Sequence, residues 1–360
     1  MIRQAGKSKY RFVMLACKKR CCGCRNKTGI QVYERNSMKK TWIFFAKCIL
    51  AALPFLAVIV FTAAAPLCYM DKEYPARAYT HEVIGSDADH DVLILGDSRA
   101  MADVLPTELG DSCVSLATGG ATAIENYFYL EDYLEEHTAP KKCLILYAPF
   151  HYSYMDNFMQ RTVYFNDLSI AQTAEVMING RKCGSETICS DGLVSDLIAS
   201  RLRLPTQYLP ALLNARFTGR YETNTQLLRD LETTKGYAPF GTADGSDELN
   251  YETSYETLRE SGDADLIRLY LQKTLDLCRE KGIKAYLLQP PMNRASYESL
   301  QEGFIENYTL LLQSFADLYP QAVVETQIPC YENALFGDSS HLNTQGAKVY
   351  TEEIRQKYLY

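Results

Sequence analysis

Asp91-Val-Leu-Ile-Leu-Gly-Asp-Ser-Arg99 is the stretch that decides the fold. Its four consecutive apolar residues, 92–95, are typical of a short strand buried on both faces of a parallel sheet. Gly96 ends the run with a residue that tolerates a tight turn. Ser98 is therefore expected at the carboxyl end of a strand, where open α/β sheets bind their ligands. From this stretch alone, a simple helix cap at Asp97 or Ser98 is an equally good interpretation.

A second polar stretch, Phe336-Gly-Asp-Ser-Ser-His341, comes just before a helical pattern over about residues 344–358. Asp338 stands three residues before His341, so its carboxylate can hold the Nδ1–H of the imidazole and leave Nε2 basic. The alternative is a solvated acidic loop with an incidental histidine. Together with Ser98, the pair predicts a Ser98–His341–Asp338 catalytic triad.

This combination resembles the SGNH (GDSL-like) hydrolase family over roughly residues 90–360. The sequence 96–98 matches the first block of the family, Gly-Asp-Ser, and residues 338–341 match the last block, Asp-x-x-His. Gly119-Gly120-Ala-Thr122 matches a glycine block after the second strand. The closest resemblance is to a membrane-anchored branch that includes the teichoic-acid D-alanyl transfer and alginate O-acetylation proteins.

The resemblance implies a flavodoxin-like five-stranded parallel sheet of order 2-1-3-4-5, with an oxyanion hole formed by the N–H groups of Ser98 and Gly120. The sequence departs from the family after the third strand, where Leu146-Tyr-Ala-Pro-Phe-His151 lacks the usual oxyanion Asn. His151 is a candidate substitute or substrate contact, or else a surface histidine. Arg99 is a candidate partner for an anionic substrate, or for a local carboxylate. Asn293, after the fourth strand, is a further candidate on the ligand side of the sheet.

The chain is strongly asymmetric in charge. Residues 1–41 hold 12 Lys/Arg and one acid, a net charge of +11, and the remaining residues carry −18. The 21 residues from Cys48 to Cys68 are uncharged, close to the length of about 20 that spans a bilayer. A cleaved signal peptide ending at Ala63-Ala64-Ala65 is the alternative, which the long leader and Pro66 disfavour.

These patterns predict four segments. Residues 1–41 are a basic cytoplasmic tail with Cys17, Cys21, Cys22 and Cys24, and residues 42–69 are a transmembrane anchor oriented by the positive-inside rule. Residues 70–90 are a stalk, and residues 91–360 are an extracytoplasmic α/β domain.

Within that domain, strands are expected at 92–95, 113–117, 143–147, 284–288 and 323–326, and helices at 121–136, 264–279 and 297–318. A helical insertion covers about 151–260, with helices near 168–177 and 193–213 and a polar span from 218 to 253. Cys183 and Cys189 are the best candidates for a disulfide.

The resemblance implies a serine O-acyl esterase or O-acyltransferase that modifies cell-envelope or exported polysaccharide, with a multi-span membrane acyl exporter as partner. The alternative is an SGNH-fold binding or scaffold protein without turnover, and a phospholipid esterase is a third option. We expect a lipid bilayer as a partner but no cofactor, no metal site and no nucleic acid, since the large domain is acidic.

Overall fold

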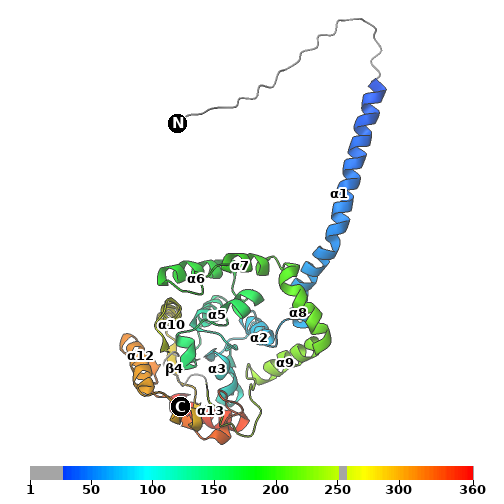
Figure 1. Ribbon diagram of the computed structural model, residues 1–360. Coiled ribbons are helices and arrows are strands. Elements are labelled where there is room, and N and C mark those ends of the chain that lie inside the picture. The colour runs from blue at the N-terminus through cyan, green and yellow to red at the C-terminus, as the bar shows by residue number, and fades with distance from the viewer. Residues whose placement is uncertain (1–26, 251–257, 360) are drawn as a thin grey trace, which may run out of the picture. The chain divides into compact units, whose positions relative to one another are not determined.

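The computed structural model describes residues 27–250 and 258–359 (Figure 1). The chain divides into two units, Met1–Leu56 and Ala57–Tyr360. All described residues of the first unit belong to helix α1 (Lys27–Ala64), whose last turns fall in the second unit. Its segment Met38–Ala64 is long and apolar enough to cross a membrane. The predicted tail, with its four cysteines, lies mostly outside the described residues.

The expected anchor ends earlier than predicted. Helix α1 stops at Ala64, and Pro66–Cys68 forms a short 3₁₀ turn, η1. Ala65 leaves the helical conformation because a residue before proline is disfavoured there. Tyr69 and Met70, which we placed in or beside the anchor, are buried in the second unit.

A five-stranded parallel sheet forms the centre of the second unit. The strand order β2-β1-β3-β4-β6 is the predicted 2-1-3-4-5 order in chain sequence, as in flavodoxin-like sheets. A separate pair joins β5 (Met292–Asn293) to β7 (Cys330–Tyr331). The bounds of the five strands are β1 (Val92–Gly96), β2 (Cys113–Ser115), β3 (Lys142–Leu146), β4 (Lys284–Leu288) and β6 (Val323–Val324).

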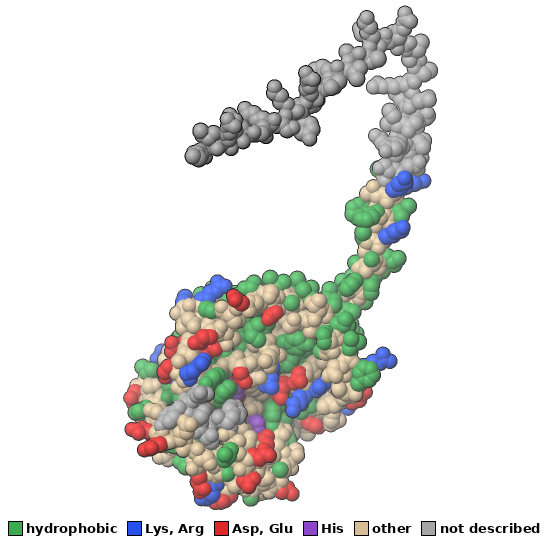
Figure 2. Space-filling model, in the orientation of Figure 1, with side chains coloured by type: hydrophobic (Ala, Val, Ile, Leu, Met, Phe, Trp, Pro, Cys, Tyr) green, Lys and Arg blue, Asp and Glu red, His purple; other side chains and the backbone are tan. Residues whose placement is uncertain are grey.

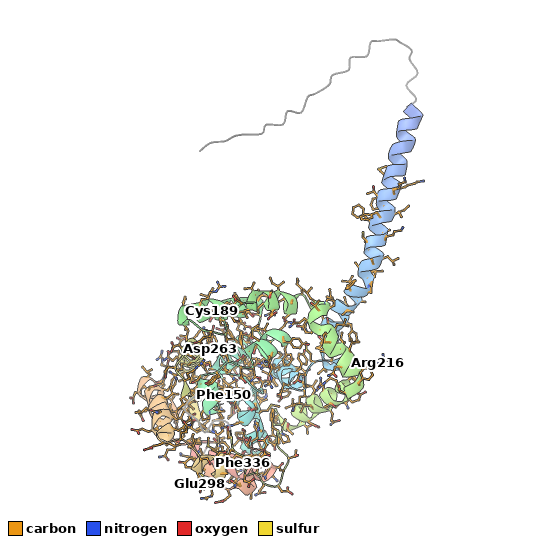
Figure 3. The ribbon with its side chains drawn as sticks, viewed as in Figure 1. Phe150, Cys189, Arg216, Asp263, Glu298 and Phe336 are labelled. Atoms are coloured by element: carbon orange, nitrogen blue, oxygen red, sulfur yellow. The ribbon has the colours of Figure 1, made fainter. Side chains whose placement is uncertain are left out.

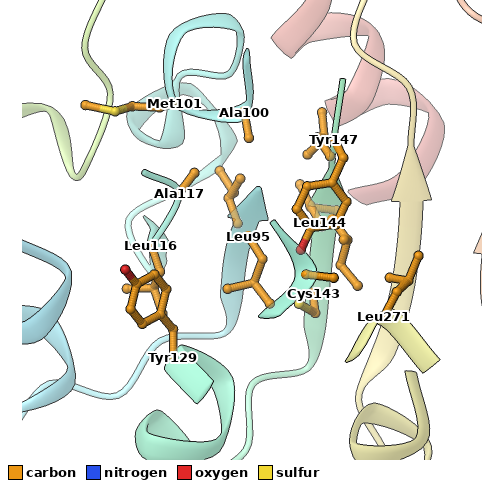
Figure 4. Close-up of a cluster of buried hydrophobic side chains, with 14 of the residues drawn as sticks. Leu95, Ala100, Met101, Leu116, Ala117, Tyr129, Cys143, Leu144, Tyr147 and Leu271 are labelled. Atoms are coloured by element: carbon orange, nitrogen blue, oxygen red, sulfur yellow. The ribbon is translucent and has the colours of Figure 1, made fainter. Parts of the chain in front are cut away.

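Helices cover both faces of this sheet. Helix α5 packs on α10, whereas α13 packs on α3 and α4. Right-handed crossovers between parallel strands place these two groups on opposite faces. Side chains such as Leu95, Leu144 and Leu271 fill the core between the layers (Figure 4). The helices named here are α3 (Ser98–Asp103), α4 (Pro106–Leu109), α5 (Ala123–Glu136), α10 (Gly262–Lys281) and α13 (Thr344–Ile354), with α11 (Arg294–Glu298) and α12 (Phe304–Leu318) between β5 and β6.

Helix α2 (Tyr74–Ile84) replaces much of the predicted stalk. Its inner face, including Ala76, Thr80 and Val83, is buried in the domain. Arg77 is buried as well and forms an ion pair with the buried Asp167. The polar composition of residues 70–90 indicated a solvated tether, but the charged side chain is neutralised inside the domain instead.

The insertion is helical, as expected, but it contains two α-helices more than predicted, because the expected helix over 193–213 is broken just before Pro205 and a further helix follows Gly219. It comprises η2 (Pro149–Tyr152), η3 (Phe158–Val163), α6 (Ile170–Cys183), α7 (Leu193–Arg201), α8 (Pro205–Thr218) and α9 (Arg220–Thr234). Helix α9 lies within the span from 218 to 253, which we predicted to be polar and not helical, and its fully buried residues are Asn224 and Leu231. Gly219 separates α8 from α9 with a φ of +59°.

Two further expectations differ from the structure. The expected helix over 297–318 is broken between α11 and α12, where Gly303 adopts a φ of +79°. Cys183 and Cys189 are both free cysteines, so the expected disulfide is absent from the described part of the chain.

Candidate active site

Ser98 is the first residue of α3, directly beyond the end of β1. Gly96 makes the sharp exit from the strand with a φ of +154°, and a Cβ there would lie 2.1 Å from the carbonyl oxygen of Leu146. Asn126 of α5 holds the turn at both its backbone groups, accepting from Gly96 N at 3.0 Å and donating to Gly96 O at 3.2 Å. The position of Ser98 therefore depends on a glycine that no larger residue can replace without movement.

Asp97 caps α3 and connects it to the end of β3. One carboxylate oxygen accepts from Arg99 N at 2.9 Å, and the other accepts from Ala148 N at 2.8 Å and contacts His151 Nδ1. Burial acts to raise the pKa of Asp97, but these hydrogen bonds and the Arg99 charge bring it below its ordinary value. His151 is buried, so the surface interpretation is wrong, and its ring is held next to the residue that precedes Ser98.

The structure brings Ser98, His341 and Asp338 together. His341 Nε2 lies 2.8 Å from Ser98 Oγ, and His341 Nδ1 lies 2.9 Å from Asp338 Oδ2. Asp338 Oδ1 also accepts from the backbone N–H groups of Ser340 and His341, each at 2.7 Å. Burial acts to raise the pKa of Asp338, but the bonds from His341 and from these amides lower it overall. The carboxylate is thus held ionised, in the orientation that leaves Nε2 toward the serine.

Three contacts hold the loop that carries His341. Asp103, at the end of α3, accepts from Leu342 N at 2.9 Å. The Phe240 ring stacks on the His341 imidazole, with centroids 4.8 Å apart. Phe336, labelled in Figure 3, forms an antiparallel bridge with Leu342. The histidine therefore has little rotational freedom relative to Ser98.

The Gly119–Gly120 turn lies against a polar cluster. A Cβ on Gly119 would meet Glu73 Oε2 at 2.2 Å and Phe240 at 3.3 Å. A Cβ on Gly120, whose φ is +68°, would meet Arg161 Nη1 at 2.4 Å and the Asn157 amide at 2.7 Å. An amide and a guanidinium thus stand beside the glycine whose N–H we assigned to the oxyanion hole.

Two of the candidate substrate contacts have other positions. Arg99 is buried at 2% exposure, where its charge contributes to the lowered pKa of Asp97 and opposes, without overcoming, the rise in the pKa of Asp103. Asn293 is buried in β5, where its side chain caps α11 and donates to backbone carbonyls of residues 246 and 248. Neither side chain is placed to meet a ligand from solvent.

A small cavity of about 100 Å³ is lined by Phe240, whose ring stacks on His341, although no triad residue lines the cavity itself. Its lining also includes Met101 of helix α3 and Glu73, which lies against Gly119. Among the described residues, no three His, Cys, Asp or Glu side chains are grouped to bind a metal ion.

Sequence reasoning missed Phe240, Asn157 and Arg161. Phe240 lies in the polar span that we interpreted as a loop. Arg161 lies in the π-helical turn η3 and Asn157 directly precedes it, in a stretch where no apolar periodicity indicates which side chains point inward. Asn126 could have been recognised from the sequence, because it is a polar residue on the buried face of an amphipathic helix. No family model matches the chain, and no curated protein matches it.

Proposed function

We propose that this protein is a membrane-anchored serine O-acyl esterase or O-acyltransferase of the SGNH type, acting on cell-envelope or exported polysaccharide. The observation that carries the proposal is the Ser98–His341–Asp338 arrangement, with 2.8 Å from Oγ to Nε2 and 2.9 Å from Nδ1 to the carboxylate. A serine hydroxyl is a weak nucleophile unless a base removes its proton, and this geometry supplies the base and its orienting carboxylate.

In the proposed reaction, Ser98 Oγ attacks the acyl carbonyl carbon as His341 Nε2 takes its proton. The tetrahedral intermediate collapses to an acyl-serine, and the departing alkoxide oxygen takes the proton from His341. Water or a sugar hydroxyl then attacks the acyl-serine while His341 Nε2 takes its proton. The second tetrahedral intermediate collapses, the ester bond to Ser98 breaks, and Ser98 Oγ takes the proton back from His341, which gives hydrolysis or transfer. Asp338 stabilises the imidazolium in both halves of the cycle.

The oxyanion requires donors that are fixed before the reaction begins. The N–H of Ser98 begins a helix and has no carbonyl partner within it. Gly120 N–H is the second donor in our proposal, and Asn157 supplies the amide that is absent from the end of β3. The close packing of the Asn157 amide and Arg161 guanidinium on Gly120 supports this assignment.

The cavities favour a small acyl group on a polar acceptor. The cavity of about 100 Å³ beside Phe240 and Met101 has room for a few heavy atoms such as an acetyl group. An open hollow of about 430 Å³ lies next to the Asp338 loop, lined by polar residues that include Asp244, Asn343 and Gln345. Such side chains suit hydrogen bonding to sugar hydroxyls.

Membrane attachment is part of the proposal. The span Met38–Ala64 follows a tail rich in Lys and Arg, so the positive-inside rule puts the tail in the cytoplasm and the α/β domain outside. Acyl groups made inside the cell must cross the bilayer to reach this domain. A multi-span acyl exporter is therefore the expected partner.

The test uses a serine-directed fluorophosphonate probe on the full chain in detergent micelles. Wild type is expected to label, Ser98→Ala is expected to lose labelling, and Ser339→Ala is the matched control beside His341 that should retain it. Labelling followed by release of acetate from acetylated polysaccharide would support the esterase. If folded wild type does not label, Ser98 is not an activated nucleophile and the scaffold interpretation replaces the enzyme.

A further inference from the structure

The exposed apolar side chains of the domain are concentrated in one part of the insertion. Beyond Ala64, the described residues include 12 large hydrophobic side chains that are exposed, and nine of them lie between residues 170 and 221. Figure 2 shows hydrophobic side chains gathered along this edge of the domain, over helices α6, α7 and α8. The nine are Ile170, Ile178, Val194, Ile198, Leu202, Leu209, Leu213, Phe217 and Tyr221.

These side chains form rows along the helices. Val194, Ile198 and Leu202 recur every four residues along α7 and just past its end, and residues 209, 213 and 217 do the same along α8. Residues four apart share one face of a helix, so each helix has an outer apolar face in addition to the one that packs inward. Between α6 and α7 this surface is hollowed by an open groove of about 360 Å³. Contiguous exposed apolar surface of this kind marks an interaction site.

Helices α8 and α9 hold the chain where it leaves the apolar span. Tyr69 packs edge-on against Tyr208 of α8, with ring centroids 5.9 Å apart. Asn224 of α9 donates to the backbone carbonyls of Leu67 and Met70, both at 3.0 Å. Tyr69 is five residues beyond Ala64, so the chain between them reaches at most about 18 Å. The docked end of the connection is therefore close to the end of the apolar span.

The charge around the rows is basic, in contrast to the rest of the domain. Residues 193–221 contain four Arg and one Asp, a net charge of +3, whereas the chain after residue 41 carries −18. Arg216 projects from the outer side of α8 in Figure 3, one residue before the 83% exposed Phe217. Helices with apolar rows flanked by arginine are typical of segments that lie in the membrane interface and attract anionic lipids.

We propose that the outer face of α7 and α8, here called the docking face and made of Val194, Ile198, Leu202, Leu209, Leu213 and Phe217, inserts into the headgroup region of the bilayer that holds α1. The short connection keeps this face near the lipid. Arg201 and Arg203 are held by contacts inside the domain, so Arg216 and Arg220 are the residues that would pair with anionic headgroups. Docking would limit rotation of the domain about its tether and set the height of Ser98 above the membrane. The inference does not depend on the proposed enzymatic activity.

Quenching of a single tryptophan by brominated lipid tests the proposal on the full chain. Trp42 is the only tryptophan of the protein, so Trp42→Phe gives a background without one. Phe217→Trp places the probe on the docking face, and Leu310→Trp places a control on α12, at a site 62% exposed and outside the rows. Both variants are reconstituted in liposomes of phosphatidylcholine and phosphatidylglycerol, with and without bromine on the acyl chains.

We expect the Phe217→Trp variant to lose roughly half its emission in brominated liposomes, because an interfacial helix buries its apolar face about 5–10 Å into the lipid. The Leu310→Trp control should be unchanged, and adding Arg216→Glu and Arg220→Glu should reduce the quenching. Absence of quenching at position 217, or equal quenching at positions 217 and 310, would overturn the proposal. Shielding that depends on protein concentration and not on bromine would assign the face to a protein contact instead.

Discussion

Replacing Asp103 by Asn is expected to make the folded domain less sensitive to pH between about 4 and 7. Asp103 is fully buried at the end of α3, where one carboxylate oxygen accepts from Leu342 N, next to His341. Its Oδ2 has no hydrogen-bond partner among the described residues. Burial raises the pKa of Asp103 to about 7 from an ordinary value of 3.8, although His341 and Leu342 N partly oppose the rise.

Whether the stability of the fold rises or falls with pH depends on which state, folded or unfolded, holds the proton of Asp103. In the folded domain Asp103 stays protonated up to about pH 7, whereas in the unfolded chain it ionises above 3.8. The unfolded state therefore binds fewer protons over this window, and the stability of the fold declines as pH rises through it. At about 1.4 kcal/mol for each pKa unit, the interval from 3.8 to 7 corresponds to a loss of about 4 kcal/mol. Asn cannot ionise, so the Asp103→Asn variant lacks this loss.

The assay is guanidinium unfolding of the full chain in a nonionic detergent at several pH values from 4 to 8. Near-ultraviolet circular dichroism of the tyrosines reports on the domain, which contains most of the 26 tyrosines. The free energy of unfolding of Asp103→Asn, relative to wild type, should rise by about 4 kcal/mol across the series. The matched control Asp111→Asn, at an exposed position, should run parallel to wild type. Parallel curves for Asp103→Asn would refute a protonated Asp103 at neutral pH.

Three other substitutions test separate parts of the structure. Gly96→Ala should lower the free energy of unfolding by about 1–3 kcal/mol, because its Cβ would meet Leu146 O at 2.1 Å; an unchanged denaturation midpoint would contradict the close approach of the two backbones at this turn. Asn157→Ala should slow fluorophosphonate labelling roughly 10²–10³-fold with unchanged unfolding, and normal labelling would remove Asn157 from the oxyanion hole. Arg77→Met should cost about 3–5 kcal/mol because the buried Asp167 would lose its permanently charged partner and keep only His81 and the Tyr129 hydroxyl, and the added Asp167→Leu should restore part of that in the same unfolding assay.

Much of the fold was predictable because its signals are local. The apolar runs at 92–95, 143–147 and 284–288 correspond to strands β1, β3 and β4, and the parallel strand order agrees with the resemblance. Helix α5 was predicted from its amphipathic pattern within two residues of its bounds. Helix α9 was missed because its composition is polar, with few apolar residues to indicate a buried face, and only Asn224 and Leu231 are fully buried.

The candidate site was predictable only in its motifs. The spacing of Asp338 and His341 predicted their hydrogen bond, which needs just three residues of a turn. The two motifs taken together, and the family resemblance that they carry, predicted the pairing of Ser98 with His341, which lie 243 residues apart in the chain. Phe240 against His341 and Asn157 against Gly120 come from the insertion, where no motif indicated a role.

The sequence by itself determined the apolar span, the alternation of strands and helices, and the residue types that meet at the site. Those properties depend on neighbours a few positions away, whose periodicity and turn preferences are visible in the chain. Only the tertiary structure decided that α2 is buried rather than a stalk, that Arg99 and Asn293 are internal, and that Asn157 stands beside Gly120. Such contacts join segments distant in the chain, and which ones form depends on how the helices pack over the sheet.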